Sequence, residues 1–512
     1  MLKKLIFIFF GSITILSCSE RPIPLFQNTT SENDKVVSAD VGIRKREFRG
    51  AWVATIANID WPSEKGLSSD VQKKEFVNIV KHHKTVGINA LLVQVRASSD
   101  AFYSKSKEPW SEWLMGEQGI APVPFYDPME FMIEECHKNG MEFHAWLNLN
   151  RGKHKLASSV LVNHLIYSKP EWFLNYDDYV LYNFGLPEVR QYIVELVLNI
   201  VHEYDVDGIH FDDYFYPYKV NGQKLDDEDT FRKYPNGFSS IEDWRRNNID
   251  LIINKLSDEI KKEKSWVSFG ISPFGVWRNK SDDPQGSETK GGQPSYDLLF
   301  ADTRKWAMEG WIDYIAPQVY FPFEHKLVPY GTLIDWWGAN HGKANLYIGH
   351  GVYRVETESI IDAWKDPNQI ARQMDYNRYS PEVTGSIFYN TNTLMKNKLG
   401  LRDSIHARYP YPALGMEVVR NDSEISIPPM DCLAENTLDG VLLKWRNDTN
   451  KTVLYRFKKG EALNIEDPRH ILGILSGNRF LDKSRSTGLS YIYLFTSINK
   501  WNKESKPLIL EK

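Results

Sequence analysis

The chain has 512 residues, of which 42% are hydrophobic and 25% charged, with a formal net charge of -5 at pH 7. This composition is typical of a globular protein, and the charge gives no electrostatic reason to expect nucleic-acid binding. The length fits one large domain followed by a small one. Aromatic residues make up 13% of the chain, and such rings suit stacking on sugars.

The first residues resemble a bacterial export signal. Two lysines precede the apolar run Leu5 to Leu16, which is too short to span a bilayer. The run ends in Ile15-Leu16-Ser17-Cys18, which resembles the lipobox, so the resemblance implies lipid attachment to the Cys18 thiol. We therefore expect a lipoprotein signal peptide at 1-17, a flexible tether at 18-46 and a lipid-anchored location in the bacterial cell envelope, periplasmic or at the cell surface. The alternative is plain secretion with an incidental cysteine.

After the tether, short apolar runs alternate with segments of helical periodicity, as in parallel strands joined by helical crossovers. The strand-like runs are Arg49 to Ile56, Ala90 to Val95, Glu142 to Leu147, Gly208 to Asp212, Val267 to Ser272, Tyr314 to Val319, Leu346 to Gly351 and Ser386 to Tyr389. The helical segments are Val71 to Val86, Pro128 to Asn139, Pro187 to Tyr204, Ser240 to Lys262, Leu298 to Gly310, Thr332 to Trp337 and Pro367 to Tyr376. We predict an α/β fold, a (β/α)₈ TIM barrel over residues 47-410.

The loops that lead from several strands to the next helix are long, whereas the turns that lead from a helix to the next strand are short. The functional site is therefore expected at the carboxyl ends of the strands. A doubly wound open sheet shares the alternation, but it usually carries a glycine-rich phosphate loop after the first strand, and this chain has none there.

Beyond Pro410 the pattern changes to short alternating strands, at Gly440 to Trp445, Val453 to Lys458 and Leu489 to Thr496. They predict a small all-β module at 425-512, after a linker at 411-424, whose arrangement resembles a fibronectin type III sandwich. A spacer or docking role is expected for it. Cys136 and Cys432 fall in different domains, so no disulfide framework is expected.

Polar or aromatic residues stand at the carboxyl ends of all the predicted strands. Together they would form a hydrogen-bonding bowl suited to a polyhydroxylated ligand. The residues expected to bind substrate there are Trp52, Gln94, Arg96, Asn148, Asn150, Tyr214, Gln318, Tyr320, His350, Tyr389 and Asn390.

Asp212 and Asp213 are the only close pair of carboxylates in this bowl, and we predict that they are catalytic. Two neighbouring carboxyl groups split their proton affinities, so one is protonated and one ionised near neutral pH. Glycosidic bond cleavage needs that division of labour. The structural alternative is that one aspartate caps the loop or pairs with Arg96 or Arg151.

Adjacent strand residues point to opposite faces, so both aspartates serve one site only if the strand already turns at position 213. Hexosaminidases of the O-GlcNAcase type look similar here. That resemblance would make Asp212 the group that orients a substrate 2-acetamido nucleophile, and Asp213 the general acid. The competing scheme takes a second carboxylate from another strand, Glu324 or Asp313.

The sequence gives little support for a catalytic metal site or for a serine nucleophile. No histidine or cysteine spacing is typical of a zinc site, and no Gly-x-Ser-x-Gly elbow precedes a helix. We expect no cofactor.

From Phe48 to about Tyr409 the chain resembles the glycosyl-hydrolase-like family 10 domain. Four passages carry the match: 48–55, 87–90 with 93–96, 145–148 and 207–214. The resemblance implies a TIM-barrel glycosidase. One relative is associated with peptidoglycan strands stripped of their peptides, so a glycan of alternating N-acetylglucosamine and N-acetylmuramic acid is the implied substrate.

We therefore predict a glycosidase that cleaves O-glycosidic bonds in a polysaccharide, using Asp212 and Asp213. The alternative is a glycan-binding envelope lipoprotein without catalysis. A structural envelope protein that docks a partner through its β-module is a further alternative. The expected partners are the glycan and, through the lipid anchor, a membrane.

Overall fold

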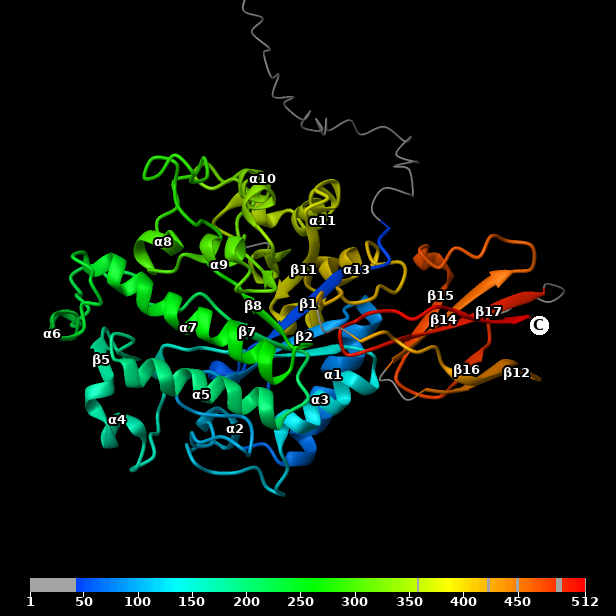
Figure 1. Cartoon of the computed structure of the whole chain (residues 1–512), viewed down its shortest axis with the longest axis horizontal. Helices are drawn as coiled ribbons and strands as arrows, with labels where there is room; N and C mark the ends of the chain where they lie inside the picture. Colours follow the sequence, from blue (N-terminus) through cyan, green and yellow to red (C-terminus); the bar gives the residue numbers. More distant parts are fainter. Residues whose placement is uncertain (1–42, 357–358, 421–423, 448–450, 485–489, 512) are drawn as a thin grey trace, which may run out of the picture. The chain divides into compact units, whose positions relative to one another are not determined.

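The computed structural model describes residues 43–356, 359–420, 424–447, 451–484 and 490–511. Its parallel strands close a barrel in the order β1-β11-β10-β9-β8-β7-β3-β2, with β2 paired to β1 (Figure 1). The strands are β1 (Phe48–Val53), β2 (Ala90–Arg96), β3 (Glu142–Leu147), β7 (Gly208–Phe211), β8 (Ser268–Ile271), β9 (Tyr314–Ile315), β10 (Asn345–Gly351) and β11 (Val383–Tyr389). The prediction of a (β/α)₈ barrel is confirmed.

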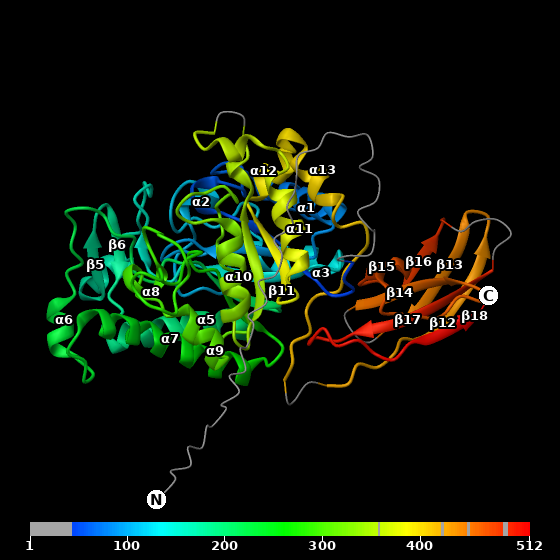
Figure 2. The ribbon, with the colours of Figure 1, turned by 90° about the horizontal axis from the view of Figure 1, so that it is seen from above.

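The predicted helices are all present and cover the outside of the barrel. They are α1 (Ser69–Val86), α3 (Pro128–Lys138), α5 (Pro187–Glu203), α7 (Ile241–Glu263), α9 (Thr303–Glu309), α10 (Tyr330–Asn340) and α11 (Gln369–Tyr379). Helices α5 and α7 lie side by side in both views (Figure 1, Figure 2). Among the described residues, no helix combines the length and the apolar character needed to cross a membrane.

Local sequence signals explain where these helices begin and end. Pro128 and Pro187 occupy the first position of α3 and α5, where a missing N–H costs nothing. Gly87 follows α1 with a φ of 99°, a left-handed conformation that glycine adopts without strain. Its N–H donates to the last carbonyls of the helix, which would otherwise stay unpaired.

The long loop after β3 contains a small antiparallel sheet that we did not predict. Its strands are β4 (Arg151–Lys153), β5 (Phe173–Tyr176) and β6 (Tyr179–Tyr182), in the order β4-β6-β5. The strands are too short for a periodic pattern to stand out in the sequence. Further short helices in the loops are α2 (Glu112–Met115), α4 (Leu165–Ser168), α6 (Glu228–Lys233), α8 (Ser295–Leu298), α12 (Thr391–Lys396) and α13 (Leu401–His406).

A hydrogen-bonded chain of side chains runs through the barrel interior. The Trp52 indole N–H donates to Nε2 of His210 over 3.1 Å, and Nδ1 of His210 is 3.0 Å from the Tyr314 hydroxyl. The same hydroxyl is 2.9 Å from Nδ1 of His144, whose Nε2 contacts Glu142 at 3.0 Å. Because an indole can only donate, Nε2 of His210 accepts and Nδ1 carries the proton. These hydrogen bonds therefore fix the indole of Trp52 in the barrel mouth.

Glycines on two strands make room for these rings. A Cβ on Gly208 would lie 2.3 Å from Nδ1 of His144, and one on Gly270 would lie 2.0 Å from Cζ of Tyr314. Both distances are far below van der Waals contact, so no larger residue fits at either position without displacing a ring. The rings of His144 and Tyr314 therefore occupy the space beside Gly208 and Gly270 in the barrel interior.

The residues beyond the barrel form two antiparallel sheets. One has the order β12-β13-β16 and the other β15-β14-β17-β18. The strands are β12 (Met430–Thr437), β13 (Gly440–Arg446), β14 (Lys451–Lys458), β15 (Ile471–Leu475), β16 (Arg479–Asp482), β17 (Tyr491–Ile498) and β18 (Leu508–Glu511). The prediction of an all-β module is confirmed, while its assignment to the fibronectin type III fold stays a prediction. Cys136 and Cys432 are buried free thiols.

Candidate active site

A pocket of about 490 Å³ lies at the carboxyl ends of the barrel strands. Of the residues that line it, only Asp212 and Asp213 are acidic. Aromatic side chains form much of its wall: Trp52, Trp146, Tyr179, Tyr214, Tyr218, Phe274, Tyr320, Phe321, Tyr353 and Tyr389. Aromatic rings can stack on sugar rings, and a pair of carboxyl groups can exchange a proton with the glycosidic oxygen. A pocket with both features is typical of a glycosidase.

Most of the predicted site residues meet in this pocket. Those that line it are Trp52, Gln94, Asp212, Asp213, Tyr214, Gln318, Tyr320 and Tyr389. Asn148 stands behind the wall, where its side-chain amide lies 3.2 Å from both carboxylate oxygens of Asp212. These residues come from β1, β2 and β11 and from the loops after β3, β7 and β9, so closure of the barrel brings them together.

Four further predicted residues do not line the pocket either, and each of them makes a hydrogen bond or ion pair elsewhere. Arg96 forms a buried ion pair with Glu108, at 2.6 Å. Asn150 donates to the carbonyl of Phe215. His350 contacts Gln373 and Ser386, and Asn390 caps α12 by accepting from the N–H of Thr393. Their position at strand ends was predicted correctly, but their side chains hold the scaffold around the pocket.

Neither candidate for a second carboxylate lies in the pocket. Glu324 pairs with Arg372 at the surface, at 2.7 Å. Asp313 precedes β9, at the amino end of the strand, where it accepts from the N–H of Phe269 and pairs with Arg420. The interpretation that paired one aspartate with Glu324 or Asp313 was therefore wrong.

Both aspartates follow the end of β7 at Phe211, so the strand alternation no longer separates them. Asp212 is 5% exposed and accepts from the indole N–H of Trp146 over 3.0 Å, besides the amide of Asn148. The N–H of Tyr214 also donates to it, at 3.3 Å. Burial raises the pKa of Asp212, while the charge of Arg151 and these donors act against that rise.

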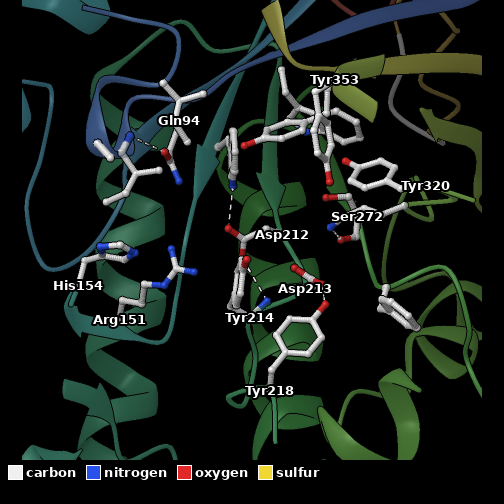
Figure 3. A pocket seen from close by; sticks show the side chains of 18 of the residues that line it. Gln94, Arg151, His154, Asp212, Asp213, Tyr214, Tyr218, Ser272, Tyr320 and Tyr353 are labelled. Carbon is white, nitrogen blue, oxygen red and sulfur yellow. Dashed lines mark hydrogen bonds between the residues drawn. The ribbon is translucent and has the colours of Figure 1, made fainter. Parts of the chain in front are cut away.

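Asp213 has a different set of neighbours. It is 4% exposed, and the Tyr218 hydroxyl donates to its carboxylate (Figure 3). Burial raises the pKa of Asp213 to about 6, and the negative charge of Asp212 adds to the rise. Hydrogen bonds from Tyr218 and Gln318 oppose it. Asp212 therefore has more groups that stabilise its charged form, whereas Asp213 keeps its proton to a higher pH than an ordinary aspartate.

Sequence reasoning missed the wall contributed by the loop after β3. Arg151, His154 and Tyr179 line the pocket there, and Arg354 lines it after β10. From the sequence, Arg151 is expected only as a possible partner of an aspartate. The one signal in the sequence was the length of the loop itself, since long loops after barrel strands build the site. Within the described part of the chain, no group of three or more His, Cys, Asp and Glu side chains is arranged to hold a metal ion.

Comparison with known proteins identifies the family of this chain. Residues 47–366 match the family described as Glycosyl hydrolase-like 10. The Glycosyl hydrolase YngK of Bacillus subtilis (strain 168) is 38% identical over 476 residues, which cover 90% of this chain and 92% of that protein. The Glycosyl hydrolase DigH of Escherichia coli (strain K12) is 35% identical over 413 residues, covering 75% of this chain and 92% of that protein.

Among solved structures, the PgaB (BpsB) glycoside hydrolase domain from Bordetella bronchiseptica superposes with a TM-score of 0.45 at 12% identity, covering 70% of this chain and 99% of that one. The family match spans most of the barrel, and both sequence relatives align over nearly their whole length. The chain belongs to the glycosyl hydrolase-like 10 family.

Proposed function

We propose that the protein hydrolyses glycosidic bonds in a polysaccharide that contains N-acetylhexosamine, such as the glycan strands of peptidoglycan. Membership of the glycosyl hydrolase-like 10 family supports a glycan-cleaving role. The observation that carries the proposal is the pair of buried, adjacent aspartates with unlike surroundings at the mouth of the barrel. The aromatic side chains of the pocket supply stacking surfaces for sugar rings.

In the proposed reaction Asp213 is the general acid. Its proton passes to the glycosidic oxygen as the bond from that oxygen to C1 breaks. The carbonyl oxygen of the sugar's own 2-acetamido group attacks C1, and Asp212 accepts a hydrogen bond from the acetamido N–H. Water then attacks C1, gives its proton to Asp213 and reopens the ring formed by the acetamido group. The configuration at C1 is retained, since two inversions occur.

The surroundings of Asp212 support its role as the orienting group. Three donors, from Trp146, Asn148 and Tyr214, hold its carboxylate in one position. A carboxylate fixed in this way is poorly placed to move toward C1 and form a bond with it. It can instead accept a hydrogen bond from the acetamido N–H and stabilise the positive charge that develops on that group.

The proposed site of action rests on the motif around Cys18. The lipobox-like motif at Cys18 supports anchoring to a membrane of the bacterial envelope, where peptidoglycan glycan is available. Residues 1–42, with Cys18 and most of the tether, lie outside the described residues. The β-module, with its three-stranded and four-stranded sheets, fits the proposed role of a fibronectin-like spacer.

The proposal is tested by Asp213→Asn in the full chain, with amidase-treated cell-wall glycan as substrate and mass spectrometry of the products. We expect kcat to fall about 100- to 10,000-fold, as for loss of a general acid, with glycan affinity largely kept. Asp258→Asn, which changes an exposed carboxylate on α7, serves as the matched control and should leave kcat unchanged.

A glycan-binding protein without catalysis would give a different result. The unsubstituted protein would then bind the glycan and release no products from treated or untreated cell wall or from a chitin oligomer. Hydrolysis that survives Asp213→Asn would equally contradict the assignment of the acid.

A further inference from the structure

Arg151, the first residue of β4, is a buried cation in the pocket wall. The residue is 7% exposed, and it points into the pocket from the side of Asp212, with Asp213 lying beyond (Figure 3). Its guanidinium lies over the ring of Tyr214, 4.0 Å from the ring centroid. The ring shields one face of the cation and leaves its N–H edge for another partner.

The charge of Arg151 has no carboxylate partner in the described part of the chain. Other buried arginines do have one: Arg96 pairs with Glu108, and Arg49 pairs with Glu47 at 2.7 Å. No ion pair within 4.0 Å involves Arg151, although its field reaches Asp212. A buried guanidinium is costly unless it is paired, so an unpaired one beside a binding pocket indicates that the ligand supplies the anion.

On the wall formed by the loop after β3, Arg151 is the cation that suits an acidic sugar. Asp212 and Asp213 together would repel a carboxylate brought close to them. His154 contributes no charge beside Arg151, because burial, together with the charge of Arg151, lowers its pKa to about 4. Arg151 is therefore the cation that can offset the acidic pair on this wall.

We propose that Arg151 binds a carboxylate carried by the substrate sugar, and that this carboxylate belongs to a lactyl ether on O3. This deepens the proposed function and rests on it. The acetamido group that Asp212 would orient is on C2, so a substituent on O3 of the same ring lies next to it, on the side of Asp212 and Arg151. A uronic acid carries its carboxylate on C5, across the ring.

Two consequences follow from this placement. The sugar whose C1 is attacked is the one that bears the lactyl group, so the bond broken is the one on its reducing side. A lactyl carboxylate that is joined to a peptide is an amide without charge, and it cannot form the bidentate ion pair with the guanidinium. A free carboxylate should therefore be preferred at this position.

The competing role of Arg151 is to act through Asp212, by stabilising its charge. That role would affect every substrate equally, because Asp212 handles the acetamido group of neutral and acidic sugars alike. Arg354, a second cation of the pocket, is the competing binder of the carboxylate. Its side chain lies over Tyr353, after β10, on the other wall.

The experiment compares matched oligosaccharides with the full chain and with Arg151→Gln. The ligands are an alternating N-acetylglucosamine and N-acetylmuramic acid oligomer with free lactyl carboxylates, its methyl ester, a chitin oligomer of equal length and a uronic acid oligomer. Affinity is measured by calorimetry and kcat/KM by product analysis. We expect Arg151→Gln to weaken binding of the free-acid oligomer about 10- to 100-fold, as for a charged hydrogen bond, and to leave the ester and chitin within about twofold.

Two further variants keep the test specific. Lys155→Gln removes an exposed positive charge four residues along the same loop and should change none of the affinities. Arg151→Lys keeps the charge without the planar fork and should recover part of the affinity for the free acid.

The inference is overturned by an equal loss on all ligands, which would assign Arg151 to Asp212. It is also overturned if only Arg354→Gln affects the free acid, if the uronic acid oligomer alone depends on Arg151, or if the free-acid oligomer does not bind. Binding that depends on Arg151 without hydrolysis by the unsubstituted protein would instead support the inference and refute the proposed function.

Discussion

At the scale of single residues, the function depends on how two identical side chains acquire different properties. Asp212 and Asp213 are adjacent and equally buried, so burial alone does not distinguish them. Asp212 receives hydrogen bonds from β3 and from the loops after β3 and β7, together with the field of Arg151. Asp213 receives one from Tyr218 and the repulsion of Asp212. The difference therefore comes from distant neighbours of Asp212, in and after β3, and from near neighbours of Asp213 in the same loop.

The assignment of Asp213 as the acid predicts a pH profile. Its pKa is about 6, so the protonated, active form is lost as the pH rises through that value, and kcat/KM should fall about tenfold per pH unit above it. The bond from Tyr218 lowers this pKa, so Tyr218→Phe should move the descending limb to higher pH. Profiles of the two proteins check this, with Tyr167→Phe at an exposed tyrosine as control. A limb that stays in place in Tyr218→Phe would mean that another group is titrating.

The buried pair of Arg96 and Glu108 yields a prediction about stability. Their side chains are 0% and 1% exposed, so Glu108→Gln leaves a buried positive charge without its partner. We expect a loss of about 3–5 kcal/mol in the free energy of unfolding, measured with urea, and unchanged glycan affinity of the folded protein. Lys138→Gln breaks an exposed pair and should cost less than about 1 kcal/mol. If Glu108→Gln weakened glycan binding and left stability unchanged, Arg96 would belong to the substrate-binding site after all.

At the scale of elements, the strands of the barrel were predictable because each is a buried apolar run between turn residues. The run from Glu142 to Leu147 coincides with β3, and Gly208 begins β7 as expected. The sheet β4-β6-β5 was not predictable, because its strands have three or four residues and mixed burial. It nevertheless carries Arg151 and Tyr179 into the pocket wall.

The polar interior of the barrel gives a prediction for strand β8. A Cβ on Gly270 would lie 2.0 Å from Tyr314, so Gly270→Ala must displace a ring that takes part in the hydrogen-bonded chain to Trp52. We expect a loss of at least about 1–3 kcal/mol in thermal or urea unfolding. Gly292→Ala is the control, since nothing lies within 4 Å of its Cβ, and it should stay within about 0.5 kcal/mol. Equal stability of the two variants would show that the interior can repack.

At the scale of the whole molecule, the proposed location depends on one thiol. If Cys18 carries lipid, the protein produced in a bacterium should enter the detergent phase of a Triton X-114 extraction, and Cys18→Ser should move it to the aqueous phase. Glycan hydrolysis by the solubilised protein should be the same for both, because the barrel begins far along the chain from Cys18. Partition of both forms into water would indicate plain secretion.

The sequence by itself determined the barrel, the order of its strands along the chain, the all-β module and the position of the acidic pair. Those features depend on local periodicity and on the residues at strand ends. Only the tertiary structure decided which strand-end residues face the pocket. Arg96 and His350 stand near strand ends as Gln94 does, yet they turn to partners such as Glu108 and Gln373, which lie in other segments. Contacts of that kind have no periodic signal, because the fold and not the spacing in sequence brings the two side chains together.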